Sequence, residues 1–166
     1  MSFTIREGIN HSSLGSTSLY LTSTTAQNIN ALATDNKMLW DTHTEEWGLD
    51  VLHRTIVDLD KITILAAATY ELSASVAFDA QSSSAARYNG ILRFRLNGTT
   101  DFGPQGKSGY LRDVTGHDES SLHVQTFPVT LARFDYIHLK VDRESDPTGT
   151  INTTPGASAL YIRRIA

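Results

Sequence analysis

The stretch at residues 59–80, LDKITILAAATYELSASVAFDA, decides the fold class of this chain. From Tyr70 onward, hydrophobic side chains occupy every second position, and Glu, Ser or Ala occupies the positions between them. This alternation is typical of a half-buried strand, because successive side chains of an extended chain point to opposite faces. A helix over residues 66–77 is the competing interpretation, but the alternation and the β-branched and aromatic residues favour a strand over residues 69–78.

The same alternation recurs further along the chain. Residues 91–96, 136–142 and 160–163 each place Leu, Ile, Val or Phe on one face and mainly polar or charged residues on the other. Many short strands of this kind, separated by turns and without a convincing helix, predict an all-β fold, an antiparallel sandwich or barrel.

Two local signals refine this prediction. Asn97-Gly98 follows a strand pattern and predicts a two-residue hairpin turn, because both residues tolerate positive φ angles. In residues 122–131, apolar residues occupy even-numbered positions at first and odd-numbered positions afterwards. We therefore expect a β-bulge near Thr126, where one extra residue would keep them on the same face. Pro128 cannot donate to a sheet ladder, which favours an edge or bulge position for it.

The composition of the chain divides it into an N-terminal arm, residues 1–36, and a folded domain, residues 37–166. The first segment is rich in Ser, Thr and Asn and holds too few apolar residues for a core. It is either an arm that orders on a partner or a floppy terminus. The residues expected to contact a partner from this arm are Phe3, Ile5, Leu14, Leu19, Tyr20 and Leu21.

The charge and the absence of cysteine exclude several classes of function. A formal net charge of -4 and scattered arginines give no basic surface for nucleic acid. No apolar run is long enough to span a membrane and no signal peptide is recognisable, so we expect synthesis in a cytoplasm, without secretion and without a membrane partner. The chain has 0 Cys, which excludes disulfides and thiolate metal sites.

The sequence does not predict a metal site or a cofactor. Residues 113–119 are rich in oxygen ligands but lack the ligand spacing of a known calcium loop, so a solvated loop is the better interpretation. Asp58 and Asp60 make a weaker case still. The 6 histidines have no metal-ligand spacing, and most of them are expected at the surface: His11, His43, His53, His117, His123 and His138.

No catalytic motif is recognisable either. The chain has no nucleophile elbow and no glycine loop with phosphate-binding spacing, so we expect a protein that is not an enzyme. A catalytic group assembled only in space stays open as an alternative.

Three segments resemble the jelly roll shared by tumour-necrosis-factor ligands and the globular heads of complement and short-chain collagens. They are residues 62–78 with their small-residue turn and tyrosine-bearing strand, residues 92–98, and residues 129–137 with a leucine-turn-aspartate entry to a strand. The last strand pattern, residues 159–165, is also similar. This resemblance implies an antiparallel jelly-roll sandwich and a homotrimer. Phe134 departs from the family pattern, which usually has glycine before the aspartate.

The chain has no collagen stalk, disulfide or secretion signal, and it looks more like the jelly rolls of bacteriophage virions. The resemblance implies a trimeric capsid decoration or cement protein that resides in the virion, attaches through its arm to the major capsid protein or another virion protein, and stabilises the shell. Aromatic residues are more often core or interface than sugar platforms, and the candidates for the trimer interface are Tyr70, Tyr136 and Tyr161. The alternative is a tail-fibre head or lectin-like module that recognises a host glycan through Tyr88, Tyr110 and His117.

Overall fold

A computed structural model of the chain describes most of the region after residue 16. The described residues are 17–29, 37–47, 50–54, 56–80, 87–107, 111–112, 119–143 and 150–166. Every regular element in these ranges is a β-strand, which confirms the all-β prediction. Within the same ranges no helix is long and apolar enough to cross a membrane.

The strands form two antiparallel sheets. Sheet A contains, in spatial order, β10 (Glu119–Leu131), β5 (Ala68–Ala80), β13 (Ala159–Arg164), β1 (Ser18–Thr22) and β2 (Thr42–Trp47), with β12 (Ile151–Thr153) also paired to β5. Sheet B contains β3 (Val51–His53), β4 (Ile62–Ile64), β11 (Tyr136–Arg143), β7 (Gly90–Leu96) and β8 (Thr100–Lys107). A separate two-stranded ribbon consists of β6 (Arg87–Tyr88) and β9 (Leu111–Arg112).

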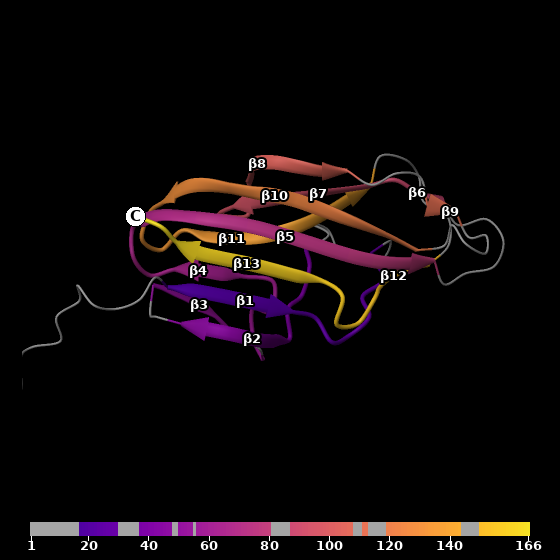
Figure 1. Cartoon of the computed structure of the whole chain (residues 1–166), viewed down its shortest axis with the longest axis horizontal. Helices are drawn as coiled ribbons and strands as arrows, with labels where there is room; N and C mark the ends of the chain where they lie inside the picture. Colours follow the sequence, from indigo (N-terminus) through magenta and orange to yellow (C-terminus); the bar gives the residue numbers. More distant parts are fainter. Residues whose placement is uncertain are drawn as a thin grey trace, which may run out of the picture.

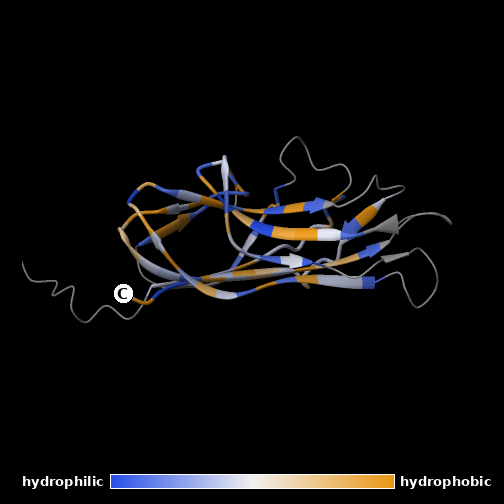
Figure 2. Cartoon of the chain, turned by 90° about the horizontal axis from the view of Figure 1, so that it is seen from above, coloured by the Kyte–Doolittle hydropathy of each residue, from blue (hydrophilic) through white to orange (hydrophobic). Residues whose placement is uncertain are grey.

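The two sheets pack face to face as a sandwich. Sheet A lies in front in Figure 1, and the view from above in Figure 2 shows two layers of strands along which hydrophobic and hydrophilic residues alternate. Both sheets and the segment before β2 contribute large, fully buried side chains to one core, among them Trp40, Tyr70, Phe78 and Phe94. Burying a side chain of this size stabilises the fold by about 1.5–3 kcal/mol, so the core is the main source of stability.

The central strand of sheet A confirms the strand interpretation of the opening stretch. β5 spans Ala68–Ala80 and alternates between buried and half-buried residues, with Leu72, Val76 and Phe78 on the core side. It pairs with β10 on one side and with β13 and β12 on the other. Because neighbours flank it on both sides, its backbone polar groups are satisfied within the sheet.

The predicted turn and bulge are also confirmed. Asn97 and Gly98 lie in the turn between β7 and β8 with φ angles of 50° and 73°, as a primed hairpin turn requires, although Thr99 also lies between the two strands, so the connection is one residue longer than predicted. In β10 the register against β5 shifts between Val124 and Phe127, where the change of parity predicted a bulge. Pro128 lies on β10, which is an edge strand of sheet A.

The expected boundary at residue 36 is wrong, because residues 17–29 belong to the sandwich. β1 lies inside sheet A between β13 and β2, and the side chains of Leu19 and Leu21 are fully buried. Two leucines on the inward face are enough here, because the neighbouring strands supply the rest of the core. Of the residues assigned to the arm, Phe3, Ile5 and Leu14 lie outside the described residues.

A buried glutamine fixes the segment that follows β1. The Gln27 side-chain amide donates to Ser23 Oγ at 2.8 Å and to the Leu39 carbonyl at 2.7 Å, and its oxygen accepts from the Leu39 amide at 2.9 Å. The Gln27 backbone N–H donates to Thr153 Oγ1 at 2.9 Å. These bonds tie the segment to residues 38–40 and to β12, so it is an integral part of the fold.

Candidate functional site

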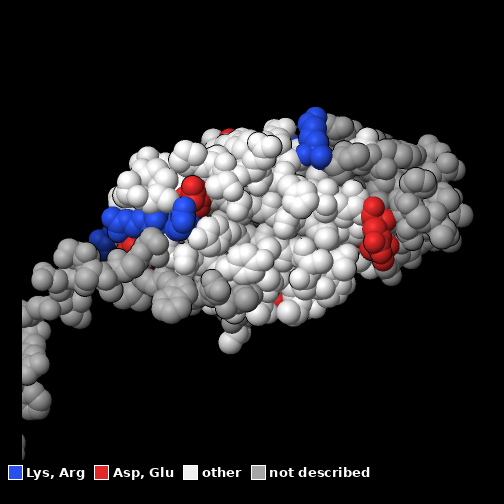
Figure 3. All heavy atoms as spheres, viewed as in Figure 1, with Lys and Arg blue, Asp and Glu red and all other residues white. Residues whose placement is uncertain are grey.

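The outward surface of sheet A is the candidate interaction site, and we call it the sheet A face. Its centre consists of half-buried, uncharged side chains from β1, β5 and β13: Ser18, Tyr20, Ser73, Ser75, Ala77, Ala159 and Tyr161. For the described residues, Figure 3 shows this face with charged side chains at its two ends and on its upper edge and almost none across the middle. Charged residues are typically depleted at the centre of protein interfaces, so this face suits association with another protein.

Two tyrosines form the aromatic part of the sheet A face. Tyr20 on β1 lies directly opposite Tyr161 on β13 in the antiparallel register, with ring centroids 6.5 Å apart and ring planes at 54°. Directly paired residues of neighbouring strands share one face, so both phenol rings point away from the core. Large, rigid side chains with a polar tip are the type enriched at protein interfaces.

An ion pair closes one end of this face. Arg163 on β13 lies opposite Glu71 on β5, and its guanidinium Nη2 donates to the Glu71 carboxylate at 2.5 Å. The Nε atom of Arg163 is buried and has no hydrogen-bond partner in the described part of the chain. A buried donor without a partner costs free energy, and an acceptor from a second molecule would remove that cost.

The prediction that Tyr70 contributes to a trimer interface is wrong, because its side chain is fully buried within one chain. It belongs to the β5 residues that face the core, and its hydroxyl donates to the Ala66 carbonyl at 2.7 Å. Burial, together with the charge of Asp50, raises the pKa of Tyr70 to about 12 against the opposing effect of Arg164. Tyr70 is therefore a neutral structural residue.

Asp50 links the strand ends around Tyr70. Its Oδ2 accepts from Thr17 Oγ1 at 2.8 Å and from the Arg164 guanidinium at 3.0 Å, and its backbone carbonyl accepts from the Leu65 amide at 2.7 Å. These contacts join residues just before β1, between β2 and β3, after β4 and at the end of β13. No sequence motif marks Asp50, because its partners are distant in the chain.

Tyr136, the second expected interface residue, lies on sheet B rather than beside Tyr161. Its ring is in edge contact with His138, with centroids 5.2 Å apart, and the Lys61 ammonium lies 4.5 Å from its centroid. The structure therefore separates the three tyrosines: Tyr70 is in the core, Tyr136 is on sheet B, and Tyr161 is on the sheet A face. Tyr20, assigned to the arm, takes the place beside Tyr161.

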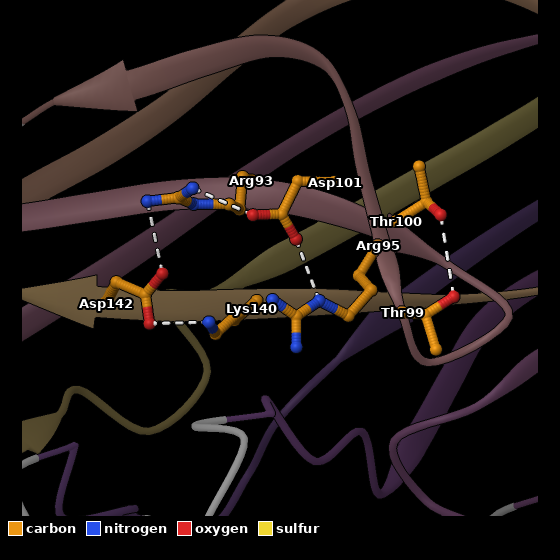
Figure 4. A network of polar contacts seen from close by, with 7 residues as sticks. All are labelled: Arg93, Arg95, Thr99, Thr100, Asp101, Lys140 and Asp142. Atoms are coloured by element: carbon orange, nitrogen blue, oxygen red, sulfur yellow. Dashed lines mark hydrogen bonds and ion pairs between the residues drawn. The ribbon is translucent and has the colours of Figure 1, made fainter.

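The outward surface of sheet B has a different character over β7, β8 and β11, because the charges there pair with one another. Figure 4 shows Arg93 and Arg95 on β7 reaching the Asp101 carboxylate at 2.8 and 2.7 Å. Arg93 also reaches Asp142 on β11 at 3.1 Å, and Lys140 reaches the same carboxylate at 3.0 Å. Burial alone would raise the pKa of Asp101, but the hydrogen bonds and charges of the two arginines lower it overall.

This difference between the sheets decides which surface is the better candidate interface. Taking the paired charges of sheet B out of water would cost desolvation energy, whereas covering the centre of the sheet A face would remove few charges from water. We therefore assign the candidate interaction site to sheet A.

Two of the histidines expected at the surface are buried. His138 points away from the core, as predicted, between the inward residues Ile137 and Leu139. It is nevertheless buried, because the turn before β4 covers it. His138 Nδ1 lies 2.9 Å from the Asp60 carbonyl and 3.1 Å from the Asp60 carboxylate. Burial lowers the pKa of His138, although its hydrogen bond to Asp60 favours the protonated ring. His53 on β3 is also buried, and its Nε2 lies 3.0 Å from the Leu59 carbonyl.

The expected glycan-contacting residues lie largely beyond what the structure describes. Tyr88 is in β6 and pairs with Leu111 of β9 in the backbone register, while Tyr110 and His117 lie outside the described residues. Among the described residues, no group of three or more His, Asp or Glu side chains is arranged to hold a metal ion.

Comparison with known proteins relates the fold to one group of structures. No protein-family model matches the sequence, and no curated protein matches it. The crystal structure of murine APRIL at pH 8.5 matches with a TM-score of 0.59, covering 91% of this chain and 100% of that chain at 12% sequence identity. The structure of Eiger TNF from S. frugiperda matches with a TM-score of 0.58, covering 91% of this chain and 93% of that chain at 7% identity.

Identities this low establish the fold alone. The similar structures are tumour-necrosis-factor-type ligands, and the two antiparallel sheets of this chain agree with their architecture. The protein is an antiparallel jelly-roll sandwich of the tumour-necrosis-factor type.

Proposed function

We propose that this protein is a non-enzymatic structural subunit that associates with itself through the sheet A face, as a homotrimer. The observation that carries the proposal is the uncharged centre of this face with the Tyr20–Tyr161 pair. The jelly-roll resemblance of the sequence implies the same trimeric state.

The energetics favour burial of this face. An aromatic side chain can bury about 150–250 Å² and dominates interface energies, and stable interfaces need about 800 Å² per partner. Tyr20 and Tyr161 from each copy supply anchors, and the Ser and Ala side chains around them allow close approach of a second surface. The ion pair of Glu71 with Arg163 limits the apolar area at one end.

The setting that we propose for this trimer is a bacteriophage virion, where it decorates the capsid and stabilises the shell. Because residues 17–29 are part of the sandwich, the segment that attaches to the major capsid protein or another virion protein is residues 1–16. Deleting residues 1–16 is expected to abolish binding to purified capsids while the shortened chain keeps its native mass. Unchanged capsid binding by the shortened chain would refute the role of this segment.

A second candidate function is recognition of a host glycan at the end of the molecule that carries β6 and β9. The pairing of these strands brings Tyr88 beside Leu111, next in sequence to Tyr110. A glycan array probed with the wild type and with Tyr88→Ala and Tyr110→Ala variants tests this function. Wild-type binding that both variants lose supports it, and an array without wild-type binding contradicts it.

A further inference from the structure

A hollow of about 270 Å³ lies on the outer surface of sheet B, at the end formed by β3 and β4. Its lining residues come from β3 and β4, from the segments that directly follow these two strands and from the turn before β11: Leu52, Arg54, Asp58, Lys61, Thr63, Leu65 and Phe134. This hollow is on the sheet opposite the sheet A face, so what it binds does not depend on self-association.

Phe134 stands out among these residues because its backbone is strained and its side chain is exposed. Its φ angle is 73°, in the left-handed region that bulky residues rarely adopt, and 65% of the residue is exposed to solvent. Residues in strained backbone conformations cluster at functional sites. The placement of an aromatic ring here is explained if the ring contacts a ligand.

The turn that carries Phe134 is firmly held. The Phe134 amide donates to the Ile64 carbonyl at 2.7 Å, and the Asp135 carboxylate accepts from the Ala132 amide at 2.8 Å and from Asn97 Nδ2 at 2.8 Å. The ring is therefore presented from a fixed backbone, which lowers the entropy cost of binding.

The polar groups of the hollow have unused binding capacity. Within the described part of the chain, neither the Arg54 guanidinium nor the Asp58 carboxylate has a hydrogen-bond or ion-pair partner. Lys61 adds a second cation, and the guanidinium of Arg133 lies 4.6 Å from the centroid of the Phe134 ring. The cations outnumber the single carboxylate of Asp58, so the complementary ligand is an anion.

We propose that this hollow binds a carboxylate-bearing saccharide, with one face of a sugar ring against Phe134 and its carboxylate at Arg54 and Lys61. A guanidinium binds a carboxylate through two parallel hydrogen bonds, and Asp58 and Thr63 are suited to the sugar hydroxyls. The volume lies below the about 300–1,000 Å³ of typical small-molecule sites, which suits a single sugar ring. β3, the adjoining edge strand, has only 3 residues, too few to template an extended peptide.

The test is a titration of the full chain with sialyllactose and, as the matched neutral ligand, with lactose, followed by amide chemical shifts. We expect sialyllactose to bind at least about tenfold more tightly than lactose, the difference that one charge-assisted hydrogen bond supplies. The shifts should map to Lys61, Thr63 and Phe134. Equal affinity for the two sugars, or binding of neither, would overturn the proposal.

Variants separate the roles of charge and ring. Arg54→Gln should lower the affinity for sialyllactose about tenfold, and Phe134→Leu, which keeps an apolar side chain but removes the ring, should lower it as well. Lys107→Gln, with the same loss of charge on the opposite edge strand of sheet B, should bind as the wild type does. Unchanged affinity in both hollow variants, or preferential binding of an acidic peptide over sialyllactose, would contradict the saccharide assignment.

Discussion

His43 and His53 join the two sheets at one edge of the sandwich, with Nε2 of His43 2.7 Å from Nδ1 of His53. His43 is on β2 opposite the buried Leu21, and His53 is on β3. Nε2 of His53 donates to the Leu59 carbonyl at 3.0 Å, so when this ring is neutral its Nδ1 accepts a hydrogen bond from His43. A continuous chain of hydrogen bonds thus links sheet A, sheet B and the segment before β4.

This relationship predicts that His53→Phe destabilises the protein although it keeps a ring of similar size. The substitution removes both hydrogen bonds of the buried imidazole, and we expect the free energy of unfolding to fall by about 1–3 kcal/mol. Urea unfolding measures this change. His123→Gln, at an exposed position, serves as the control and should change stability by less than about 0.5 kcal/mol. Equal stability of the two variants would show that the histidine pair contributes nothing.

His138 predicts a loss of stability in mild acid. Burial holds its pKa in the folded chain below the usual 6.5, so the unfolded chain binds the proton more readily. The stability from the neutral ring is fully present above pH 6.5 and is lost as the pH falls through the folded-state pKa. Between pH 6.5 and this point, the free energy of unfolding, measured by urea titration at a series of pH values, should fall less steeply in His138→Gln than in the wild type. Identical slopes would contradict the assignment.

Tyr70 predicts a second pH effect, at the alkaline end. Its pKa is about 12 in the folded chain against 10.0 for a free tyrosine, so the stability it contributes is present below pH 10 and is lost as the pH rises toward 12. Tyr70→Phe should lower stability at neutral pH by about 1 kcal/mol, because the Ala66 carbonyl loses its donor. The variant should also lose less stability between pH 10 and pH 12 than the wild type. An unchanged alkaline profile would contradict burial of this hydroxyl.

We expect Phe134→Gly to stabilise the protein, although it removes the ring that we assign to the saccharide site. Glycine adopts the φ of 73° without steric cost, and the exposed ring contributes little to the core. We expect a gain of about 1 kcal/mol, the usual cost of a left-handed conformation for a residue with a side chain. Phe134→Ala, which keeps the strain, is the matched comparison in thermal unfolding. A glycine variant that is less stable than the alanine variant would contradict the strain, and an alanine variant that is much less stable than the wild type would show that the ring has a structural role.

The position of β1 predicts different results for two truncations. Removing residues 1–16 should leave the thermal unfolding temperature unchanged, whereas removing residues 1–22 deletes Leu19 and Leu21 from the core. Each buried leucine is worth about 2–5 kcal/mol, so the longer truncation should not fold stably. If the longer truncation still folds stably, β1 is not needed for the fold, and the domain boundary at residue 36 expected from the sequence would be supported.

The strands were predictable because their signal is local. The alternation in residues 69–78 and the Asn97-Gly98 turn are properties of neighbouring residues, and the structure has β5 and the β7–β8 hairpin at these positions. The jelly-roll arrangement followed from the resemblance of short segments rather than from alternation alone.

The errors arose where burial depends on distant partners. β1 has few apolar residues and is ordered by β13, which lies at the other end of the chain. His138 has the alternation of an outward residue, yet Asp60 from a separate turn covers it. Tyr20 was assigned to the arm and Tyr70 to an interface, because a strand pattern alone does not say which face meets the core. The Leu19-Tyr20-Leu21 alternation was the available signal for β1.

The most direct test of self-association through the sheet A face is the native mass of the wild type, measured by light scattering beside a double variant, Tyr20→Arg with Tyr161→Arg. The proposal predicts three times the 18.2 kDa chain mass for the wild type and a single-chain mass for the variant. A control that places the same charges on exposed positions of the other sheet, Thr99→Arg with Gln105→Arg, should keep the wild-type mass. A wild type with the mass of one chain, or a double variant that still has the mass of three, would contradict the proposal.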